Sequence, residues 1–512
     1  MGYVLLFITI VRGIFICMMT LFKRANKIRR TTIIICGLAA CLVGIGLARV
    51  VEFPGMLWLG VGGVLLLALC RKQRVGLIIA AVFFSLLIGL WRGDELKTQL
   101  DSYKSLYNKK IIISGQATTD AVYGDKSQLS FDLGNLQLVE PSEQSLVGKL
   151  SIKGFGTSMV YRGDTVQVEG KLYQTRGSKQ GSISFADLAV VNQSDSKIES
   201  TRRQFQAGMQ SALPEPQSSF ALGLLIGQRN TLPSKVTEQL RMVGLTHIVA
   251  VSGFNLTIII YAIRKCMIGR SKYQILLLSV GLVSLFLLFT GFSASIVRAA
   301  VVSGLSLLAW YYGRRFRPLL LLLLAAVLTA FWNPLYLWSD IGWYLSFLAF
   351  GGVLMAAPLL AKRIYGKRQP GLVAQVVIES LAAQIMTLPL IMFIFGEFSL
   401  LALVANVLVV PLVPIAMLFS LIAGVAGMVV PALAGWLAWP AKMVLTYILD
   451  IAALVSRVPN IFAKQSVSVA QMLGLYALLI IVCVVMYQKS RSKNATITDE
   501  ITTNKQGFYG WS

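Results

Sequence analysis

The chain has 512 residues, of which 56% are hydrophobic and only 13% are charged. Soluble domains carry about 25% charged residues, so this composition excludes an ordinary soluble protein. Many stretches of the sequence are longer than the roughly 20 apolar residues that are needed to cross a bilayer. We therefore expect a polytopic α-helical membrane protein.

The formal net charge of +25 mainly indicates the topology of the chain in the membrane. Basic residues concentrate in short links between apolar spans, at 23–30, 71–74, 264–272, 314–317, 362–368 and 489–493. The positive-inside rule predicts that such links lie on the cytoplasmic side. Residues 92–200, in contrast, carry equal numbers of basic and acidic residues. The net charge therefore supports DNA binding only weakly.

Cysteine and histidine usage gives no support to metal or disulfide chemistry. The six cysteines lie in or beside apolar spans, and the chain has a single histidine. No zinc site or disulfide framework is expected in the polar insert, and we expect no metal ion and no cofactor. No Walker-type phosphate loop is present, so we do not expect the chain to hydrolyse nucleotide.

The N-terminal quarter begins with membrane spans. Residues 3–22 form an apolar run that Arg12 interrupts, so residues 1–30 are interpreted as an extra span and a basic loop whose place in the fold stays open. Three better spans make up residues 31–91, and they are expected at 31–51, 55–70 and 75–91.

Residues 92–200 form a polar insert, which this topology places outside the membrane. Five runs with strand-like alternation, at 111–118, 127–139, 146–155, 164–173 and 182–191, are separated by turn residues. Five short antiparallel strands predict a small OB-like β-barrel. Such barrels bind single strands through stacking aromatic residues, here Tyr123, Phe155 and Tyr161, but the neutral charge balance equally allows a structural lid.

Residues 201–242 are expected to form interfacial amphipathic helices. Val236, Leu240 and Val243 share one helix face, which is typical of a helix lying along a membrane surface.

Residues 243–488 are predicted to form the main transmembrane domain. Spans are expected at 243–262, 274–291, 294–312, 318–332, 340–361, 372–395, 398–422, 436–456 and 469–487. If the chain crosses the membrane once at each of these spans, every basic link lies on the cytoplasmic side. The polar tail at 489–512 is therefore expected in the cytoplasm.

Polar residues within these spans are candidates for a functional path, because such residues usually face a bundle interior or a watery cavity. His247, Arg298 and Asp340 are expected within about two turns of the outer face, as a polar mouth below the β domain. The path is predicted to include His247, Ser252, Gly253, Asn255, Arg298, Asp340, Ser346, Gln384 and Asn406. Ser295 and Glu379 are further polar residues within spans.

Each candidate also has a structural interpretation. His247 can serve to hydrogen-bond a neighbouring helix, and Ser252 and Gly253 can serve close helix packing. Arg298 and Asp340 can form a structural ion pair. The prolines at 389, 411 and 414 either kink helices or mark broken helices that line a path.

Intramembrane hydrolysis is a weaker hypothesis than translocation. On a continuous helix His247 and Ser252 lie about 140° apart around the axis, so they do not form a catalytic dyad. No third group within reach in the sequence orients the imidazole. We therefore expect a channel or transporter and not an enzyme.

Four ordered blocks, at 221–256, 291–315, 333–352 and 388–417, resemble the ComEC family of competence proteins, which form the inner-membrane channel for transforming DNA. They contain, in this order, the step Gly-Leu-Thr-His with a Ser-Gly turn, an Arg-Ala helix, an Asp-x-Gly-x-x-Leu-Ser segment and a proline-rich segment. An outer OB-like domain after three spans also fits, and the resemblance covers about 31–487.

The resemblance implies that single-stranded DNA crosses the bacterial cytoplasmic membrane through this chain. An extracytoplasmic receptor would deliver the DNA, and a cytoplasmic motor ATPase would pull it. The chain departs from the family at Asn255, which stands near the place of a usual histidine. It also ends without the metallo-β-lactamase-like domain of many members, so a separate nuclease is expected to degrade the second strand.

Two other classes of function remain open from the sequence. A transporter of a small solute or lipid would use the same polar path. A membrane scaffold fits less well, because it does not need so many polar residues within spans.

Overall fold

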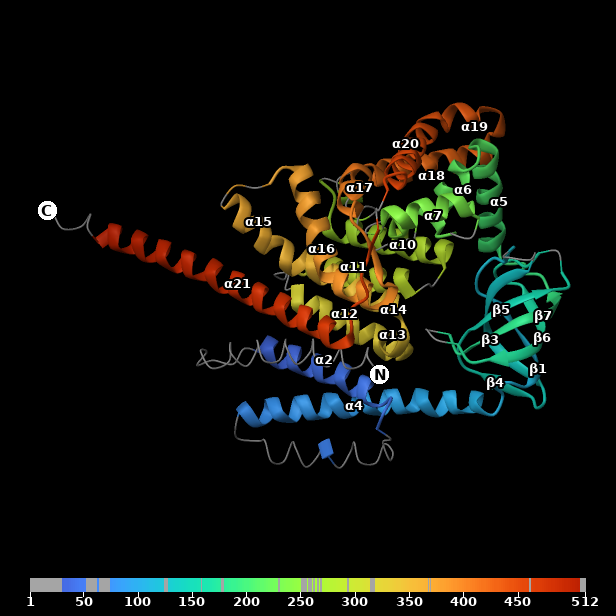
Figure 1. Ribbon diagram of the computed structural model, residues 1–512, viewed down its shortest axis with the longest axis horizontal. Helices are drawn as coiled ribbons and strands as arrows, with labels where there is room; N and C mark the ends of the chain where they lie inside the picture. Colours follow the sequence, from blue (N-terminus) through green and yellow to red (C-terminus); the bar gives the residue numbers. More distant parts are fainter. Residues whose placement is uncertain are drawn as a thin grey trace.

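The computed structural model shows a body of helices with a β domain at one end (Figure 1). It describes residues 30–51, 62–63, 74–123, 128–157, 159–175, 179–228, 231–249, 256, 260, 263–264, 267, 269–291, 294–313, 318–366, 368, 370–459 and 462–506. The run at 3–22 lies outside the described residues, as do most of the spans expected at 55–70 and 243–262.

Helices α2 (Arg30–Leu47) and α4 (Arg74–Lys104) pack with their backbones in contact. A Cβ atom built on either Gly44 or Gly89 would lie 2.1 Å from a backbone carbonyl oxygen of the other helix. Membrane helices associate through such close packing, because lipid supplies no hydrophobic force between them. The glycines therefore set the distance between these two spans.

Helix α4 is longer than the span predicted at 75–91. Residues 92–104 continue the helix, so the expectation that the β insert begins at 92 is wrong. The reason is that the polar turns still bury apolar side chains, with Leu96 5% exposed and Tyr103 fully buried. Tyr103 reaches the β domain and donates a hydrogen bond to the carbonyl oxygen of Val147 at 3.0 Å.

The described part of the β domain contains seven strands, two more than expected, because two short strands extend the sheet. They are β1 (Lys110–Ala117), β2 (Val122–Tyr123), β3 (Leu129–Glu140), β4 (Gln144–Leu146), β5 (Leu150–Phe155), β6 (Thr165–Tyr173) and β7 (Gly181–Asn192). The order is β1-β6-β7-β5-β3-β2, with β4 paired to β3 and a further pairing of β1 with β3.

The pairing differs from the expected all-antiparallel arrangement, because β5 and β7 are parallel. The predicted alternation is confirmed: Leu129, Phe131 and Leu133 are buried on β3, as are Leu150 and Ile152 on β5. These side chains fill the domain core. The sheet does not by itself confirm an OB-like barrel.

Four helices join the β domain to the remaining spans: α5 (Lys197–Ala212), α6 (Gln217–Ile226), α7 (Ser234–Val243) and α8 (Thr246–Val249). The predicted apolar face of α7 packs inward, with Leu240 and Val243 buried and Val236 partly buried against the same core. Helix α6 differs from an interfacial helix, because nine of its ten residues are buried. A surface position for the whole segment stays a prediction.

The helices of the C-terminal half are α10 (Lys272–Thr290), α11 (Ala294–Tyr311), α12 (Pro318–Trp332), α13 (Leu335–Ser339), α14 (Ile341–Gly351), the π-helix η2 (Gly352–Ala356), α15 (Ala357–Tyr365), α16 (Leu372–Phe395), α17 (Ala402–Val409), the 3-10 helix η3 (Val410–Leu412), α18 (Val413–Val429), α19 (Pro431–Leu437), α20 (Trp439–Ser456) and α21 (Val469–Gln506). Two short strands, β8 (Glu397–Ser399) and β9 (Phe462–Lys464), form an antiparallel pair with each other. Pro389 lies inside α16, and Pro411 lies in η3 between α17 and α18.

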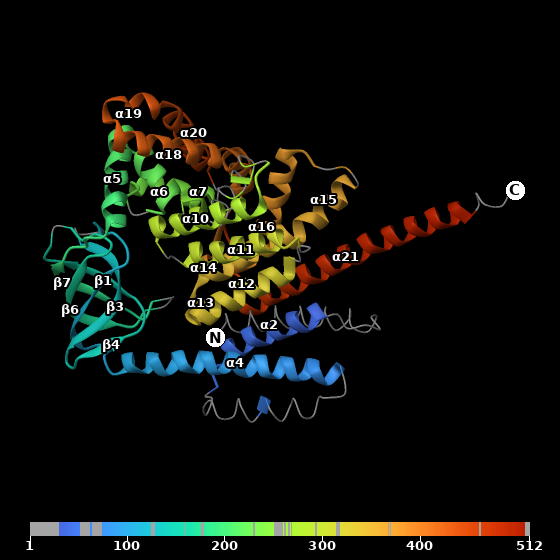
Figure 2. The same cartoon turned by 180° about the vertical axis from the view of Figure 1, so that it is seen from behind.

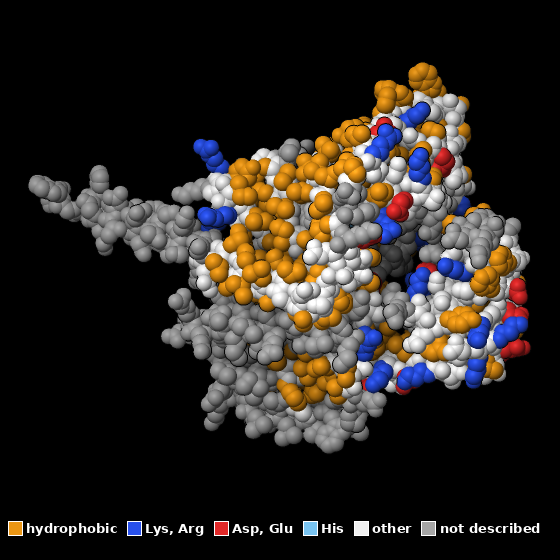
Figure 3. Space-filling model, in the orientation of Figure 1, with side chains coloured by type: hydrophobic (Ala, Val, Ile, Leu, Met, Phe, Trp, Pro, Cys, Tyr) orange, Lys and Arg blue, Asp and Glu red, His pale blue; other side chains and the backbone are white. Residues whose placement is uncertain are grey.

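Six helices within the described residues are long and apolar enough to cross a membrane. They are Lys272–Thr290, Ile341–Tyr365, Ala374–Phe395, Ala402–Val429, Trp439–Ser456 and Val469–Met486. Apolar side chains cover much of the helical surface, whereas charged side chains gather on and near the β domain (Figure 3). Leu277 and Leu285 of α10, for example, are more than half exposed. The prediction of a polytopic helical membrane protein is therefore confirmed.

The helices share two main apolar cores. One core joins α5–α8 to α17–α20, and the other joins α2 and α4 to α12–α14, α16 and α21. Helix α19 packs against α5 and lies at the same end of the helical body as the β domain (Figure 2). Strict alternation of the spans at 398–422 and 436–456 would place the turn between them at the opposite end. Helix α21 runs away from the β domain and continues to Gln506, so the first part of the expected polar tail is helical (Figure 1).

Candidate functional site

Arg298 of α11 lies buried next to the first turn of α14. Its side chain is 5% exposed, and its Nη2 donates to the carbonyl oxygen of Gly342 at 3.1 Å. Asp340 caps α14 by accepting a hydrogen bond from the backbone N–H of Trp343 at 3.1 Å. An Asp340 carboxylate oxygen lies 3.9 Å from Arg298 Nη1. The structure thus brings together two charged residues that the sequence predicts at a common depth.

The hydrogen bonds of Arg298 are incomplete within the described residues. Its Nε and Nη1 groups are buried and have no hydrogen-bond partner there. The 3.9 Å separation from Asp340 is longer than a charge-assisted hydrogen bond, which spans about 2.7–2.9 Å. Asp340 therefore offsets the charge of Arg298, but it does not supply a close hydrogen bond to the two donor groups that lack a partner in the described part of the chain. A purely structural ion pair does not explain these unbonded donors.

The segment around Asp340 is held rigidly by indole hydrogen bonds. Trp343 Nε1 donates to Thr329 Oγ1 at 3.0 Å, which ties α14 to α12. Trp338 Nε1 donates to the carbonyl oxygen of Ile45 at 2.8 Å, which ties α13 to α2. Buried N–H groups of this kind fix the position of an aromatic ring as well as its burial. The position of Asp340, between α13 and α14, is therefore set by hydrogen bonds to two other helices, α12 and α2.

His247 lies apart from this pair. It is exposed on the short helix α8, and its Nδ1 lies 3.1 Å from the carbonyl oxygen of Gly244, three residues earlier. Among the described residues no hydrogen bond or ion pair joins His247 to Arg298 or Asp340. Ser252, Gly253 and Asn255 lie outside the described residues. The polar mouth formed by all of these residues stays a prediction.

Three further path candidates lie on helices that pack together. Ser346 is half-buried on α14, and α16 packs against both α14 and α17. The side-chain oxygens of Gln384 on α16 and Asn406 on α17 are buried without a hydrogen-bond partner among the described residues. Glu379, in contrast, accepts a hydrogen bond from Gln375 of its own helix at 2.9 Å. A continuous path through these groups stays a prediction.

Sequence reasoning missed a buried ionic cluster where the β domain meets α5. We call it the junction cluster, and its members are Asp120, Arg162, Glu199, Arg202 and Gln206. Asp120 and Arg202 lie 2.8 Å apart with side chains 7% and 6% exposed, and Glu199 lies 3.6 Å from Arg202. Gln206 Nε2 also donates to Asp120 at 3.2 Å. Only the spacing of Glu199 and Arg202 on one helix was visible in the sequence.

The protonation of Asp120 follows from this environment. Burial by itself raises the pKa of the carboxyl group, because it disfavours the charged form. The charge and the hydrogen bonds of Arg202, together with hydrogen bonds from the Arg162 backbone and Gln206, outweigh burial and lower the pKa below its ordinary value. Asp120 is therefore ionised at neutral pH.

The predicted stacking residues have different surroundings. The ring of Tyr161 is covered by the guanidinium of Arg203 at 5.1 Å, and the side chain of Tyr123 lies outside the described residues. Phe155 is 40% exposed and lies beside Phe185, with ring centroids 6.5 Å apart. Phe185 is 69% exposed and has a positive φ of 57°, which is an outlier for a bulky residue. The alternation of the sequence did not single out Phe185, because a β-bulge in β7 interrupts the pairing with β5 at this residue.

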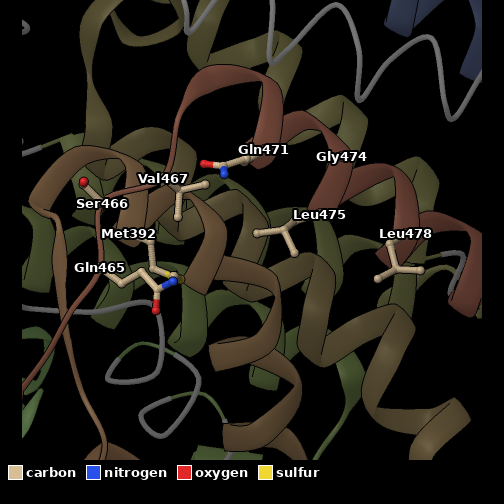
Figure 4. Close-up of a pocket in the computed structure, with 8 residues that line it drawn as sticks. All are labelled: Met392, Gln465, Ser466, Val467, Gln471, Gly474, Leu475 and Leu478. Atoms are coloured by element: carbon tan, nitrogen blue, oxygen red, sulfur yellow. The ribbon is translucent and has the colours of Figure 1, made fainter.

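A separate cavity of about 500 Å³ lies between α16 and α21 (Figure 4). It is lined by Met392, Gln465, Ser466, Val467, Gln471, Gly474, Leu475 and Leu478. It contains none of the predicted path residues, so it is distinct from the Arg298 site.

Comparison with known proteins gives the family. The family model for competence proteins matches residues 224–489, which is about half of the chain. The ComE operon protein 3 of Bacillus subtilis (strain 168) is 28% identical over 210 residues, a match covering 40% of this chain and 26% of that relative. No solved structure matches. The matched region contains Arg298, Asp340, Gln384 and Asn406, and the chain belongs to the ComEC family of competence proteins.

Proposed function

We propose that this chain forms the membrane path through which DNA, as a single strand, crosses the cytoplasmic membrane during natural transformation. Family membership supports a role in competence. The observation that carries the translocation step is Arg298, a buried guanidinium between apolar helices, two of whose donor groups have no hydrogen-bond partner among the described residues. A guanidinium binds phosphate oxygens through paired N–H groups, so a passing phosphodiester would complete its hydrogen bonds.

The orientation belongs to the same proposal. The β domain would face the outside and the far end of α21 the cytoplasm, because the basic links then all lie inside. The position of the β domain and the end of α21 at opposite ends of the helices supports this assignment (Figure 1). An extracytoplasmic receptor would then deliver DNA to the β domain, and a cytoplasmic ATPase would pull the strand.

We further propose that the β domain is OB-like and contacts the single strand. The pairing of β1 with β3, in addition to the order β1-β6-β7-β5-β3, supports a sheet that closes on itself. Phe155 and Phe185 on neighbouring strands offer an exposed pair of aromatic rings, and Lys153 on β5 is exposed as well. Stacking on aromatic rings next to basic residues is the general mode of binding single strands.

The path is tested by uptake of labelled DNA in cells that carry Arg298→Ala or Arg298→Lys at matched membrane levels. A hydrogen bond to a charged group contributes about 1.5–3 kcal/mol, so we expect Arg298→Ala to lower uptake at least about tenfold. Arg298→Lys keeps the charge and should be intermediate. Arg457→Ala, at an exposed position after α20, is the control. Wild-type uptake in Arg298→Ala would remove this residue from the path.

The β domain is tested by the affinity of the full chain in detergent for fluorescent oligo-dT. Stacking contributes about 1–3 kcal/mol per base, so Phe155→Ala and Phe185→Ala should each weaken binding by about fivefold or more. Tyr173→Ala is the matched control, because Tyr173 is exposed to a similar extent but lies on β6, outside the Phe155–Phe185 pair, and the ammonium of Lys171 already covers its ring. Equal weakening by all three substitutions would contradict a specific stacking site.

A further inference from the structure

One residue of the β domain reaches across to the membrane helices. Arg162 lies in the turn before β6, and its Nη2 donates to the carbonyl oxygen of Leu288 at 2.9 Å and its Nη1 to that of Phe289 at 3.4 Å. Both carbonyls belong to the last turn of α10, where helical carbonyls have no partner within the helix. A cation at this end also interacts favourably with the helix dipole. Arg162 thus caps the end of α10.

The same side chain is fixed on its other face by the junction cluster. Arg162 Nε lies 2.9 Å from a carboxylate oxygen of Glu199 on α5, and its backbone N–H donates to Asp120 at 3.0 Å. Its side chain is only 15% exposed, so these bonds are shielded from water. One guanidinium therefore links the β domain, α5 and α10.

Helix α10 leads directly to the helix that carries Arg298. A Cβ atom built on Gly291, just after α10, would lie 2.8 Å from Arg162 Nη1, so only a glycine leaves room for this side chain at that position. Helix α11 begins at Ala294, and Arg298 follows about one turn later. Helices α10 and α11 also pack against each other. A shift of Arg162 would therefore move this helix pair at its β-domain end.

We propose that Arg162 is a positioning residue that ties the β domain to the α10–α11 pair, so that displacement of the β domain changes the position of Arg298. This inference rests on the proposed function of Arg298 in the DNA path. The junction cluster fixes Arg162 to the β domain, and the helix cap fixes it to α10. Contact of the β domain with DNA would then be transmitted to the helices below it.

Hydrogen exchange of the full chain in lipid nanodiscs tests the link without DNA. Arg162→Gln should speed exchange at the end of α10 and the start of α11 by about tenfold or more, since each bond to a charged group contributes at least that factor. Arg203→Gln is the matched control. It removes the same charge from the same junction, but Arg203 bonds to Ser194 and Glu199 and covers Tyr161. Unchanged exchange in Arg162→Gln would overturn the proposal.

DNA uptake and DNA binding test the positioning role itself. Arg162→Gln should lower uptake at least about tenfold while the affinity for oligo-dT stays within about twofold of wild type, and Arg162→Lys should restore part of the uptake. A merely structural role would lower affinity and uptake together, and unchanged uptake would also refute the link. Failure of the proposed function would give a different result. Cells that carry Arg298→Ala would then take up DNA at the wild-type rate, whatever hydrogen exchange shows for Arg162→Gln.

Discussion

Removing the charge of Asp120 tests the most deeply buried ion pair described between the β domain and α5. Asp120→Asn preserves the size of the side chain and leaves Arg202, 6% exposed, without its partner at 2.8 Å. Breaking such a pair costs about 3–5 kcal/mol. Glu199 stays 3.6 Å from Arg202, so we expect the lower end, about 3 kcal/mol. For a domain of this size that lowers Tm by about 12 °C or more.

The assay is temperature-dependent proteolysis of the β domain in the full chain, in detergent. Glu169→Gln is the control, because Glu169 pairs with Lys110 at 2.6 Å but both side chains are exposed, and such pairs contribute at most about 1 kcal/mol. The double variant Asp120→Asn/Arg202→Met should recover much of the loss, since no buried charge is then left unpaired. If the single variant is as stable as the control, the ion pair does not hold the junction.

Two further predictions concern pH and helix packing. The lowered pKa of Asp120 means that its ion pair contributes fully above about pH 4, the ordinary pKa of an aspartate, and that this stability is lost as the pH falls through the lowered folded pKa. Proteolysis of the wild-type β domain should therefore accelerate as the pH falls below about 4. The Asp120→Asn variant should lack this acceleration, because it has no carboxyl group at this position to protonate. Gly89→Val should push α2 away from α4 by about 1 Å or more, because its Cβ would lie 2.1 Å from a carbonyl oxygen of α2. A cysteine cross-link between the two helices should then form more slowly than in Gly474→Val, where a Cβ meets no atom within 4 Å. Equal cross-linking rates would show that the glycines do not set the helix distance.

The sequence by itself determined the membrane class and the candidate charges. An apolar run long enough to span a bilayer forms an α-helix, because its backbone N–H and C=O groups find no water in lipid and must hydrogen-bond within the segment. Strict alternation likewise predicted the buried faces of β3 and β5, since side chains on a strand alternate between its two faces. Arg298 and Asp340 could be chosen because a charge within an apolar span is costly and needs a partner.

The tertiary structure decided what depends on contacts between distant segments. The partner of Arg202 is Asp120, 82 residues earlier, and the cap of α10 is Arg162, more than 120 residues earlier. No local periodicity encodes such pairs. The same holds for the position of α19 beside α5. Span counting uses loop charges, whereas the close packing of Gly208 on α5 against Gly424 and Gly427 of α18, the helix before α19, brings these segments together. Hydropathy and period fix which faces are apolar, and only the folded chain fixes which of these faces meet.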